Sequence, residues 1–322
     1  MQPTHLSTTP AAALPALVEA AERARDYLYA SKAASTRRAC QSNWRRFAAW
    51  CEASRLPALP ASSSTVALYL AARDDQRKCS TLGRRLVAIS QAHKAAGHGS
   101  PTAAALVRET WKGIRREKGT APQAKAPAVT ADLRAMVATL PASLLGQRDR
   151  ALPLLGFAGA FRRAELVGLD GAHLAFGREG LTVTLRRSKT DQEGQGRQVG
   201  IPYGSTPATC PVRAVQGWLA AAGIGEGALF RAVNRHGALG AGRLSARAVA
   251  LVVKRSAQVA GLDPARYAGH SLRAGLATSA AAAGVPERAI MAQTGHRSLP
   301  MLRRYIREGS LFRGNAAAAV GL

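Results

Sequence analysis

The chain has 322 residues, with 45 Lys or Arg against 19 Asp or Glu, so its formal net charge is +26. With 47% hydrophobic and 20% charged residues it is a globular chain long enough for about two domains, which excludes a disordered basic tail. This charge favours a polyanionic partner, above all nucleic acid, because codon bias explains an excess of Arg over Lys but not a shortage of acids.

The first third of the chain predicts a helical domain, residues 27–118, behind a variable or poorly ordered lead, residues 1–26. Apolar residues at helical spacing follow Ser35, and Ser62-Ser63-Ser64 is a cap for the next helix. Further helices are predicted over 81–96 and 104–118. In the first of these, Leu82, Leu86 and Ile89 are expected to face inward, with Arg84 and Arg85 outward.

Residues 119–129 contain two prolines and few large apolar residues, which indicates a linker to a second domain over 130–310. In this domain, apolar and polar residues alternate over 181–185, which predicts a β-strand. It is expected to pair with residues 197–202 across a polar loop and form a small β-hairpin. The remaining pattern is helical. Helices are expected over 130–140, 151–169, 212–222, 243–261, 272–283, 286–293 and 299–307. The fold class is therefore mainly α with a small antiparallel sheet.

Several classes of protein are excluded by missing patterns. No stretch approaches the roughly 18 apolar residues of a membrane span, and the apolar run 11–18 lacks the basic lead of a signal peptide. The cysteines show no zinc-type spacing, and the chain has no P-loop or H-E-x-x-H motif. We therefore expect a cytoplasmic, nucleoid-associated protein that needs neither a metal nor another cofactor.

Two short motifs place charged residues where an anion could bind. Arg162 and Glu165 interrupt an apolar stretch, and a buried guanidinium is costly unless it is paired or lines a functional cleft. The plainer interpretation is an exposed Arg–Glu pair. His270 and Arg273 are spaced to share the first turn of a helix, where backbone N–H groups also favour an anion.

Three further residues are ordinary by themselves. Lys189 lies in the loop of the predicted hairpin, where a lysine is usually just solvated. His296 follows a glycine, and Tyr305 comes nine residues later in a helical segment. A single tyrosine is most often a half-buried aromatic with a satisfied hydroxyl. The order of all these motifs along the chain is what makes them informative.

The order of these motifs resembles the tyrosine recombinase (phage integrase) family in its simple, Cre-like form. The motifs are, in chain order, R-x-x-E-L at Arg162, a hairpin Lys, H-x-x-R, G-H and then Tyr. The resemblance covers roughly residues 35–310. It implies a helical, SAM-like core-binding domain and an α+β catalytic domain. It also implies a site-specific recombinase that exchanges DNA strands through a 3′-phosphotyrosine and a Holliday junction. Ala160 stands where the family often has Gly.

The resemblance implies a role for each motif residue. Arg162, Arg273 and His296 would hold the non-bridging phosphate oxygens, for which planar guanidiniums are well suited. Tyr305 would be the nucleophile and His270 its proton acceptor, since a free tyrosine with a pKa of about 10 is rarely ionised at neutral pH. Two further roles complete the implied site: Lys189 as general acid for the leaving 5′-oxygen, and Glu165 as a support for the His or Arg.

Double-stranded DNA and a homotetramer assembled on it are the partners that the resemblance implies. Candidate DNA-binding residues are Arg38, Ser42, Arg84, Arg85 and Arg247, each of which could equally be a phosphate contact or a solvated side chain. The tail, residues 311–322, is expected to be frayed, part of the core, or docked onto a neighbouring protomer.

Two alternatives share part of this pattern. A type IB topoisomerase uses a similar Arg, Lys, His and Tyr set, but relaxes DNA as a monomer. A catalytically dead architectural protein would bind DNA without cutting it, although the complete motif set argues against that. A metal-dependent nuclease is disfavoured because the sequence shows no carboxylate cluster at two-metal spacing.

Overall fold

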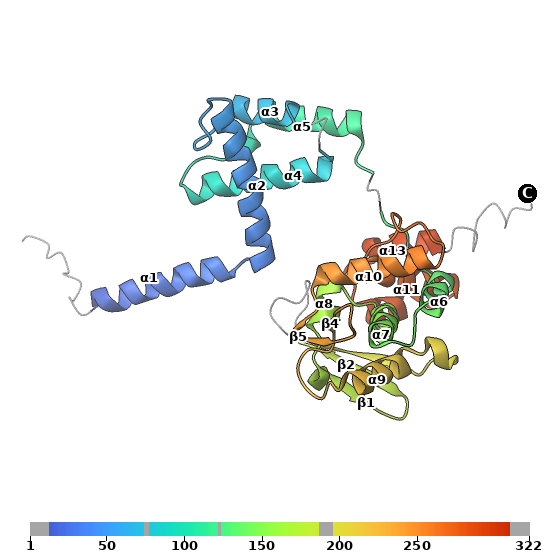
Figure 1. Ribbon diagram of the computed structural model, residues 1–322. Helices are drawn as coiled ribbons and strands as arrows, with labels where there is room; N and C mark the ends of the chain where they lie inside the picture. The colour runs from blue at the N-terminus through green and yellow to red at the C-terminus, as the bar shows by residue number, and fades with distance from the viewer. Residues whose placement is uncertain (1–12, 74–76, 122–123, 187–195, 310–322) are drawn as a thin grey trace, which may run out of the picture. The chain divides into compact units, whose positions relative to one another are not determined.

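The computed structural model describes residues 13–73, 77–121, 124–186 and 196–309 (Figure 1). The chain divides into two compact units, residues 1–123 and 124–322, each with its own hydrophobic core. In the part of the chain that is described, no helix has the length and apolar character needed to cross a membrane.

The first unit is helical, as the sequence predicts. Its helices are α1 (Ala13–Ala30), α2 (Ala34–Ala53), α3 (Ser63–Ala71), α4 (Cys79–Ala95) and α5 (Ala105–Lys118). Helix α2 packs on α4 and α3 on α5, and their apolar faces enclose Phe47, Tyr69 and Leu82. The predicted cap is confirmed, since the Ser62 hydroxyl accepts the Thr65 backbone N–H at 3.0 Å.

Part of the predicted lead is helical. Residues 13–26, expected to be variable or poorly ordered, form most of α1. The segment is rich in Ala, Leu, Glu and Arg, which have the highest helix propensities. Arg23 Nη1 also lies 2.5 Å from Glu19 Oε1, one turn earlier on the same helix. Local propensity and this ion pair both favour a helix here.

Arg85 does not face outward, so that prediction is wrong. Its side chain is buried, and its Nη1 donates to the Tyr69 hydroxyl at 2.7 Å. Arg85 follows Leu82 by three residues and precedes Ile89 by four, which places all three on one helix face. The spacing that made Leu82 and Ile89 core residues should have placed Arg85 with them. Arg84, one residue earlier, is exposed as predicted.

The second unit combines helices with two small sheets. Its helices are α6 (Thr130–Ala138), α7 (Leu144–Ala158), α8 (Arg163–Gly168), α9 (Pro211–Ala222), α10 (Ala246–Val259), α11 (Ser271–Ala282), α12 (Glu287–Thr294) and α13 (Leu299–Gly309). Its strands are β1 (Leu174–Phe176), β2 (Gly180–Leu185), β3 (Arg197–Pro202), β4 (Arg231–Val233) and β5 (Leu239–Arg243). Strands β1, β2 and β3 form an antiparallel sheet in that order, and β4 pairs with β5.

The predicted hairpin is confirmed. Strands β2 and β3 are antiparallel, with Leu181 opposite Ile201 and Val183 opposite Val199. These four side chains are buried, as the alternating pattern requires. The hairpin loop, residues 187–195, lies outside the described residues and contains Lys189.

The apolar stretch 151–169 forms two helices, not one. Helix α7 ends at Ala158, and α8 begins only at Arg163. Between them Ala160 adopts a left-handed φ of 48°, a conformation that favours glycine. A Cβ on Gly159 would lie 2.2 Å from the Phe161 ring, so this turn needs glycine to pack. The break places Arg162 at the start of α8.

The predicted helix 243–261 begins three residues late, because its first residue belongs to a strand. Arg243 ends β5, and its Nη1 donates to the Val167 and Leu169 carbonyls at 2.7 and 2.9 Å. Its Nη2 pairs with Asp170 Oδ1 at 2.5 Å. Helix α10 then starts after Ser245, whose hydroxyl caps it. Arg243 thus fixes the end of α8.

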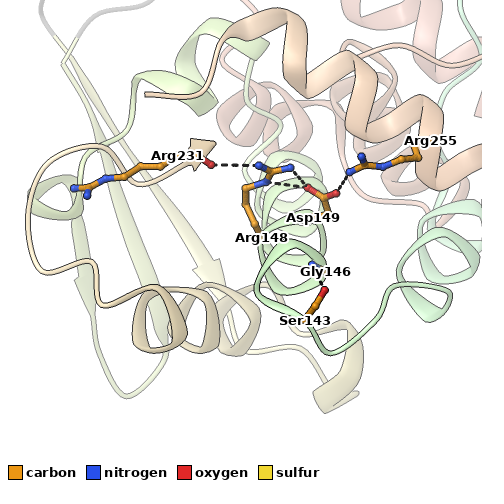
Figure 2. Close-up of polar contacts among 6 residues, drawn as sticks. All are labelled: Ser143, Gly146, Arg148, Asp149, Arg231 and Arg255. Carbon is orange, nitrogen blue, oxygen red and sulfur yellow. Dashed lines mark hydrogen bonds and ion pairs between the residues drawn. The ribbon is translucent and has the colours of Figure 1, made fainter. Parts of the chain in front are cut away.

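An ion-pair network around the buried Asp149 joins α7 to α10 and β4 (Figure 2). Asp149 Oδ1 accepts from Arg148 Nε at 2.9 Å and Nη2 at 2.7 Å, and Oδ2 accepts from Arg255 of α10. Arg148 Nη1 reaches the Arg231 carbonyl at 3.3 Å. Asp149 is 1% exposed, so these contacts replace its hydration completely.

The variant Asp149→Asn should lower the free energy of unfolding by roughly 3–5 kcal/mol, because it leaves the buried Arg148 guanidinium without a counter-charge. Urea unfolding followed by circular dichroism measures this. Glu179→Gln, which removes an exposed carboxylate in the same unit, is the matched control and should leave the midpoint nearly unchanged. Equal stabilities of the two variants would show that the network contributes nothing.

Candidate active site

Arg162 is held at the start of α8 by the Glu165 carboxylate. Its backbone N–H donates to Glu165 Oε2 at 2.8 Å, and its Nη1 pairs with Glu165 Oε1 at 2.5 Å. The Glu165 side chain is 3% exposed and that of Arg162 is 20% exposed. The exposed Arg–Glu pair considered from sequence is therefore wrong, since Glu165 is buried and fixes an Arg162 side chain that is only partly exposed.

Arg273 is the second guanidinium and is 1% exposed. Its Nη1 donates to the Ala160 carbonyl at 2.8 Å, which links α11 to the break before α8. Its Nη2 is also buried and has no hydrogen-bond acceptor among the described residues. On the same helix, Gly275 lets α11 pack against Ala128, since a Cβ there would lie 1.9 Å from the Ala128 carbonyl oxygen.

The two guanidiniums make this part of the unit strongly cationic. Burial, and then the charge of Arg162, lower the pKa of Arg273 to about 10, while Glu165 opposes that shift. Arg273 is still protonated at neutral pH, so it is a buried cation whose Nη2 has no acceptor among the described residues. A bound anion would stabilise it, because it would supply both the missing charge and the missing acceptor.

His296 lies beside these cations, just beyond the end of α12. Burial, and then the charges of Arg273 and Arg162, lower its pKa to about 4, so the ring is neutral at pH 7. The Thr294 hydroxyl donates its one proton to the Ile290 carbonyl at 2.7 Å, so at 2.7 Å it accepts from His296 Nδ1–H. In the neutral ring Nε2 is therefore an acceptor, and it can donate only after protonation.

Tyr305 lies between two imidazoles. Its hydroxyl is 2.9 Å from His270 Nε2, and its ring centroid is 5.8 Å from that of His296. Helix α13 is held there by a small core in which Leu302 packs against α11 and α12. Tyr305 is half-buried and His270 is exposed. The hydroxyl thus has a neighbouring base, and a charged substrate can reach it from solvent.

The structure brings together most of the residues singled out from sequence. They come from α8, α11, α13 and the turn after α12. The residues brought together are Arg162, Glu165, His270, Arg273, His296 and Tyr305. Lys189 lies outside the described residues. Arg38 and Ser42 on α2, Arg84 on α4 and Arg247 on α10 are exposed, whereas Arg85 is not.

Arg197 belongs to this cluster and was missed from sequence. It interacts electrostatically with Glu165, Arg162, Arg273 and His296, and its Nη2 is buried without an acceptor among the described residues. The available signal was the alternation of β3. Because Val199 and Ile201 point inward, a period of two places Arg197 on the same face.

Comparison with known proteins identifies the family. The model of the phage integrase family matches residues 128–310, which is more than half of the chain. The chain belongs to the phage integrase family. This tyrosine recombinase is 41% identical over 298 residues to the integrase/recombinase xerD homolog of Selenomonas ruminantium, covering 91% of this chain and 87% of that protein.

Two solved structures share the fold of this recombinase. One is the XerH site-specific recombinase bound to palindromic difH substrate, a post-cleavage complex, with a TM-score of 0.59, 17% identity, and coverage of 80% of this chain and 72% of that chain. The other is a lambda integrase dimer bound to a COC′ core site, with a TM-score of 0.59, 15% identity, and coverage of 91% and 77%. They confirm the mainly helical fold with a small antiparallel sheet.

Proposed function

We propose that this site-specific recombinase cleaves and rejoins DNA through a 3′-phosphotyrosine on Tyr305. The observation that carries the proposal is the 2.9 Å hydrogen bond between the Tyr305 hydroxyl and His270 Nε2. Next to it lies a cationic cluster in which Arg273 Nη2 has no acceptor among the residues that the structure describes. A nucleophile, a proton acceptor and an anion site together are what phosphoryl transfer needs. The relatives named as recombinases, and the XerH and lambda integrase structures in complex with DNA, support DNA as the substrate.

In the proposed reaction the Tyr305 oxygen attacks the scissile phosphorus. The new bond joins Tyr305 to the 3′-phosphate, the bond from phosphorus to the 5′-oxygen breaks, and the phenolic proton passes to His270. We assign Lys189 to protonate the leaving 5′-oxygen, which gives a free 5′-hydroxyl. Attack of a 5′-hydroxyl from another strand reverses these steps. The phosphodiester energy is retained in the phosphotyrosine, so religation consumes no ATP.

Arg162 and Arg273 are assigned to the non-bridging oxygens, whose negative charge grows as the nucleophile adds. Glu165 keeps Arg162 in place while leaving part of its side chain exposed. Arg273 is already fixed by the Ala160 carbonyl, so its Nη2, which has no acceptor among the described residues, needs no reorganisation to donate to a phosphate oxygen. His296 would add a third donor once it is protonated.

Binding of DNA should raise the pKa of His296 from about 4 towards or above its ordinary value of 6.5. A phosphate offsets the charges of Arg273 and Arg162, so the cationic ring is no longer disfavoured and Nε2 can donate. Histidine ¹⁵N chemical shifts, followed against pH in free and DNA-bound Tyr305→Phe protein, measure this. In Arg273→Gln the DNA-free pKa should already be higher; an unchanged pKa on DNA binding would contradict the account.

Both units are proposed to contact DNA. Arg38, Ser42 and Arg84 of the first unit and Arg247 of the second are exposed, and the net charge of +26 supplies a salt-sensitive attraction to phosphates. We further propose that four copies assemble on DNA at the nucleoid in the cytoplasm. Tail docking onto a neighbouring protomer belongs to this proposal, but residues 311–322 lie outside the described part of the chain.

Selection of bound duplexes from a random library, followed by a plasmid test, examines this function. Two copies of a selected duplex are placed on one supercoiled plasmid. Excision or inversion of the intervening segment is expected without ATP. Relaxation of the plasmid without exchange would indicate a topoisomerase, and binding without either reaction would indicate an architectural protein.

A further inference from the structure

Arg197 is placed where the hairpin meets the active site. It is the first residue of β3 and lies opposite Leu185, the last residue of β2, so it sits at the base of the loop that contains Lys189. Its neighbour Gln198 is exposed, whereas Arg197 faces the same side as the buried Val199. None of the family motifs found in the sequence includes this arginine.

The guanidinium of Arg197 caps the C-terminal end of α12. Its Nη1 donates to the Gln293 carbonyl at 3.1 Å and to the Ala292 carbonyl at 3.3 Å. Carbonyls in the last turn of a helix have no N–H partner within the helix, and a cation there is also favoured by the helix dipole. The Gln293 side chain adds donations to the Ala158 and Gly200 carbonyls at 2.8 and 3.1 Å. The end of α12 is thereby fixed to β3 and to the end of α7.

The turn that leads to His296 rests on this guanidinium. Gly295 ends α12 in a left-handed conformation with a φ of 64°, which favours glycine. A Cβ there would lie 2.9 Å from Arg197 Cζ, so the backbone of Gly295 packs directly against Arg197. His296 is the next residue, and its Nδ1 is held by Thr294 on the other side of the same turn. Displacement of Arg197 would therefore displace the imidazole.

We infer that Arg197 is a positioning residue, which fixes His296 against Tyr305 by capping α12 from the base of the β2–β3 hairpin. The inference rests on the proposed function, since it assigns Arg197 a part in the same strand cleavage. Arg197 acts through His296 and does not have to touch the DNA. It also joins two parts of the site, because the strand that carries Arg197 continues from the loop with Lys189.

A double-mutant cycle tests whether Arg197 acts through His296. Single-turnover formation of the covalent protein–DNA adduct is measured on a nicked duplex for wild type, Arg197→Ala, His296→Ala and the double variant. Arg197→Ala should slow adduct formation by roughly 10- to 100-fold in the wild-type background, the cost of a small misplacement in an active site. In the His296→Ala background the same change should cost less than about 3-fold.

Two further variants separate this role from a general loss of structure. Arg197→Lys should recover much of the rate, because an ammonium can still donate to the α12 carbonyls. Gln198→Ala, on the exposed side of the same strand, should leave the rate unchanged. Thermal unfolding of each variant checks that it is folded.

Three results would overturn the inference. They are equal costs of Arg197→Ala in the two backgrounds, a rate for Arg197→Ala that equals wild type, and no recovery with Lys. If the wild-type protein forms no adduct, the proposed function itself fails, and that result is distinct from the others.

Discussion

Tyr305→Phe is expected to lower strand cleavage by roughly 10⁴-fold or more, because the variant has no oxygen with which to bond the phosphorus. The phenyl ring still packs between His270 and His296, so the fold and DNA binding should be retained. Adduct formation on a nicked duplex, resolved in denaturing gels, measures the loss. A mobility-shift assay with intact duplex measures binding.

Tyr203→Phe is the matched control for this variant. Tyr203 is also half-buried in the second unit, but it is not part of the cationic cluster. Its replacement should leave cleavage close to wild type. Adduct formation that persists in Tyr305→Phe, or that disappears in Tyr203→Phe, would show that the nucleophile has been assigned to the wrong residue.

Arg273→Ala should slow adduct formation by roughly 10²–10³-fold, the usual cost of removing one donor that stabilises transition-state charge. The reason lies in its contacts: Nη1 is held by the Ala160 carbonyl, and Nη2 is buried with no acceptor among the described residues. Arg273→Lys should recover little of the rate of adduct formation, because a single ammonium cannot bind the Ala160 carbonyl and a phosphate oxygen in the geometry of a planar guanidinium.

A neutral scissile group distinguishes a charge contact from a folding defect. On a duplex with a methylphosphonate at the cleavage site, Arg273→Ala should come within about 10-fold of the wild-type rate, since there is less negative charge to stabilise. A defect of the same size on both substrates would mean that Arg273 supports the structure and not the phosphate. Denaturant unfolding of the variant provides an independent check.

Local patterns predicted most elements of the second unit, but not the break that forms the active site. Alternation of Leu181 and Val183 defined the hairpin, and helical spacing located α11 to α13. The break at 159–162 has no proline and no polar run. It depends on a left-handed Ala160 and on the Phe161 ring packing at Gly159, and residue type does not signal the first of these, because alanine favours a continued helix.

The site residues could be named from sequence only because their motifs occur in a family order. Nothing local pairs His270 with Tyr305, which lie 35 residues apart and meet because α13 packs on α11. Arg85 and Arg197 show the reverse case. Their positions follow from simple periodicity, yet they were misplaced or missed because a charged side chain is normally expected to face solvent.

The central claim is that Tyr305 becomes covalently joined to the 3′-phosphate of a cleaved strand without a metal ion. The measurement that tests it most directly is mass spectrometry of the peptide–nucleotide adduct, formed on a nicked duplex in the presence of EDTA and digested with protease and nuclease. We predict a single modified residue, Tyr305, carrying a 3′-linked nucleotide. An adduct on another residue, or cleavage that needs a divalent cation and leaves no adduct, would contradict the account.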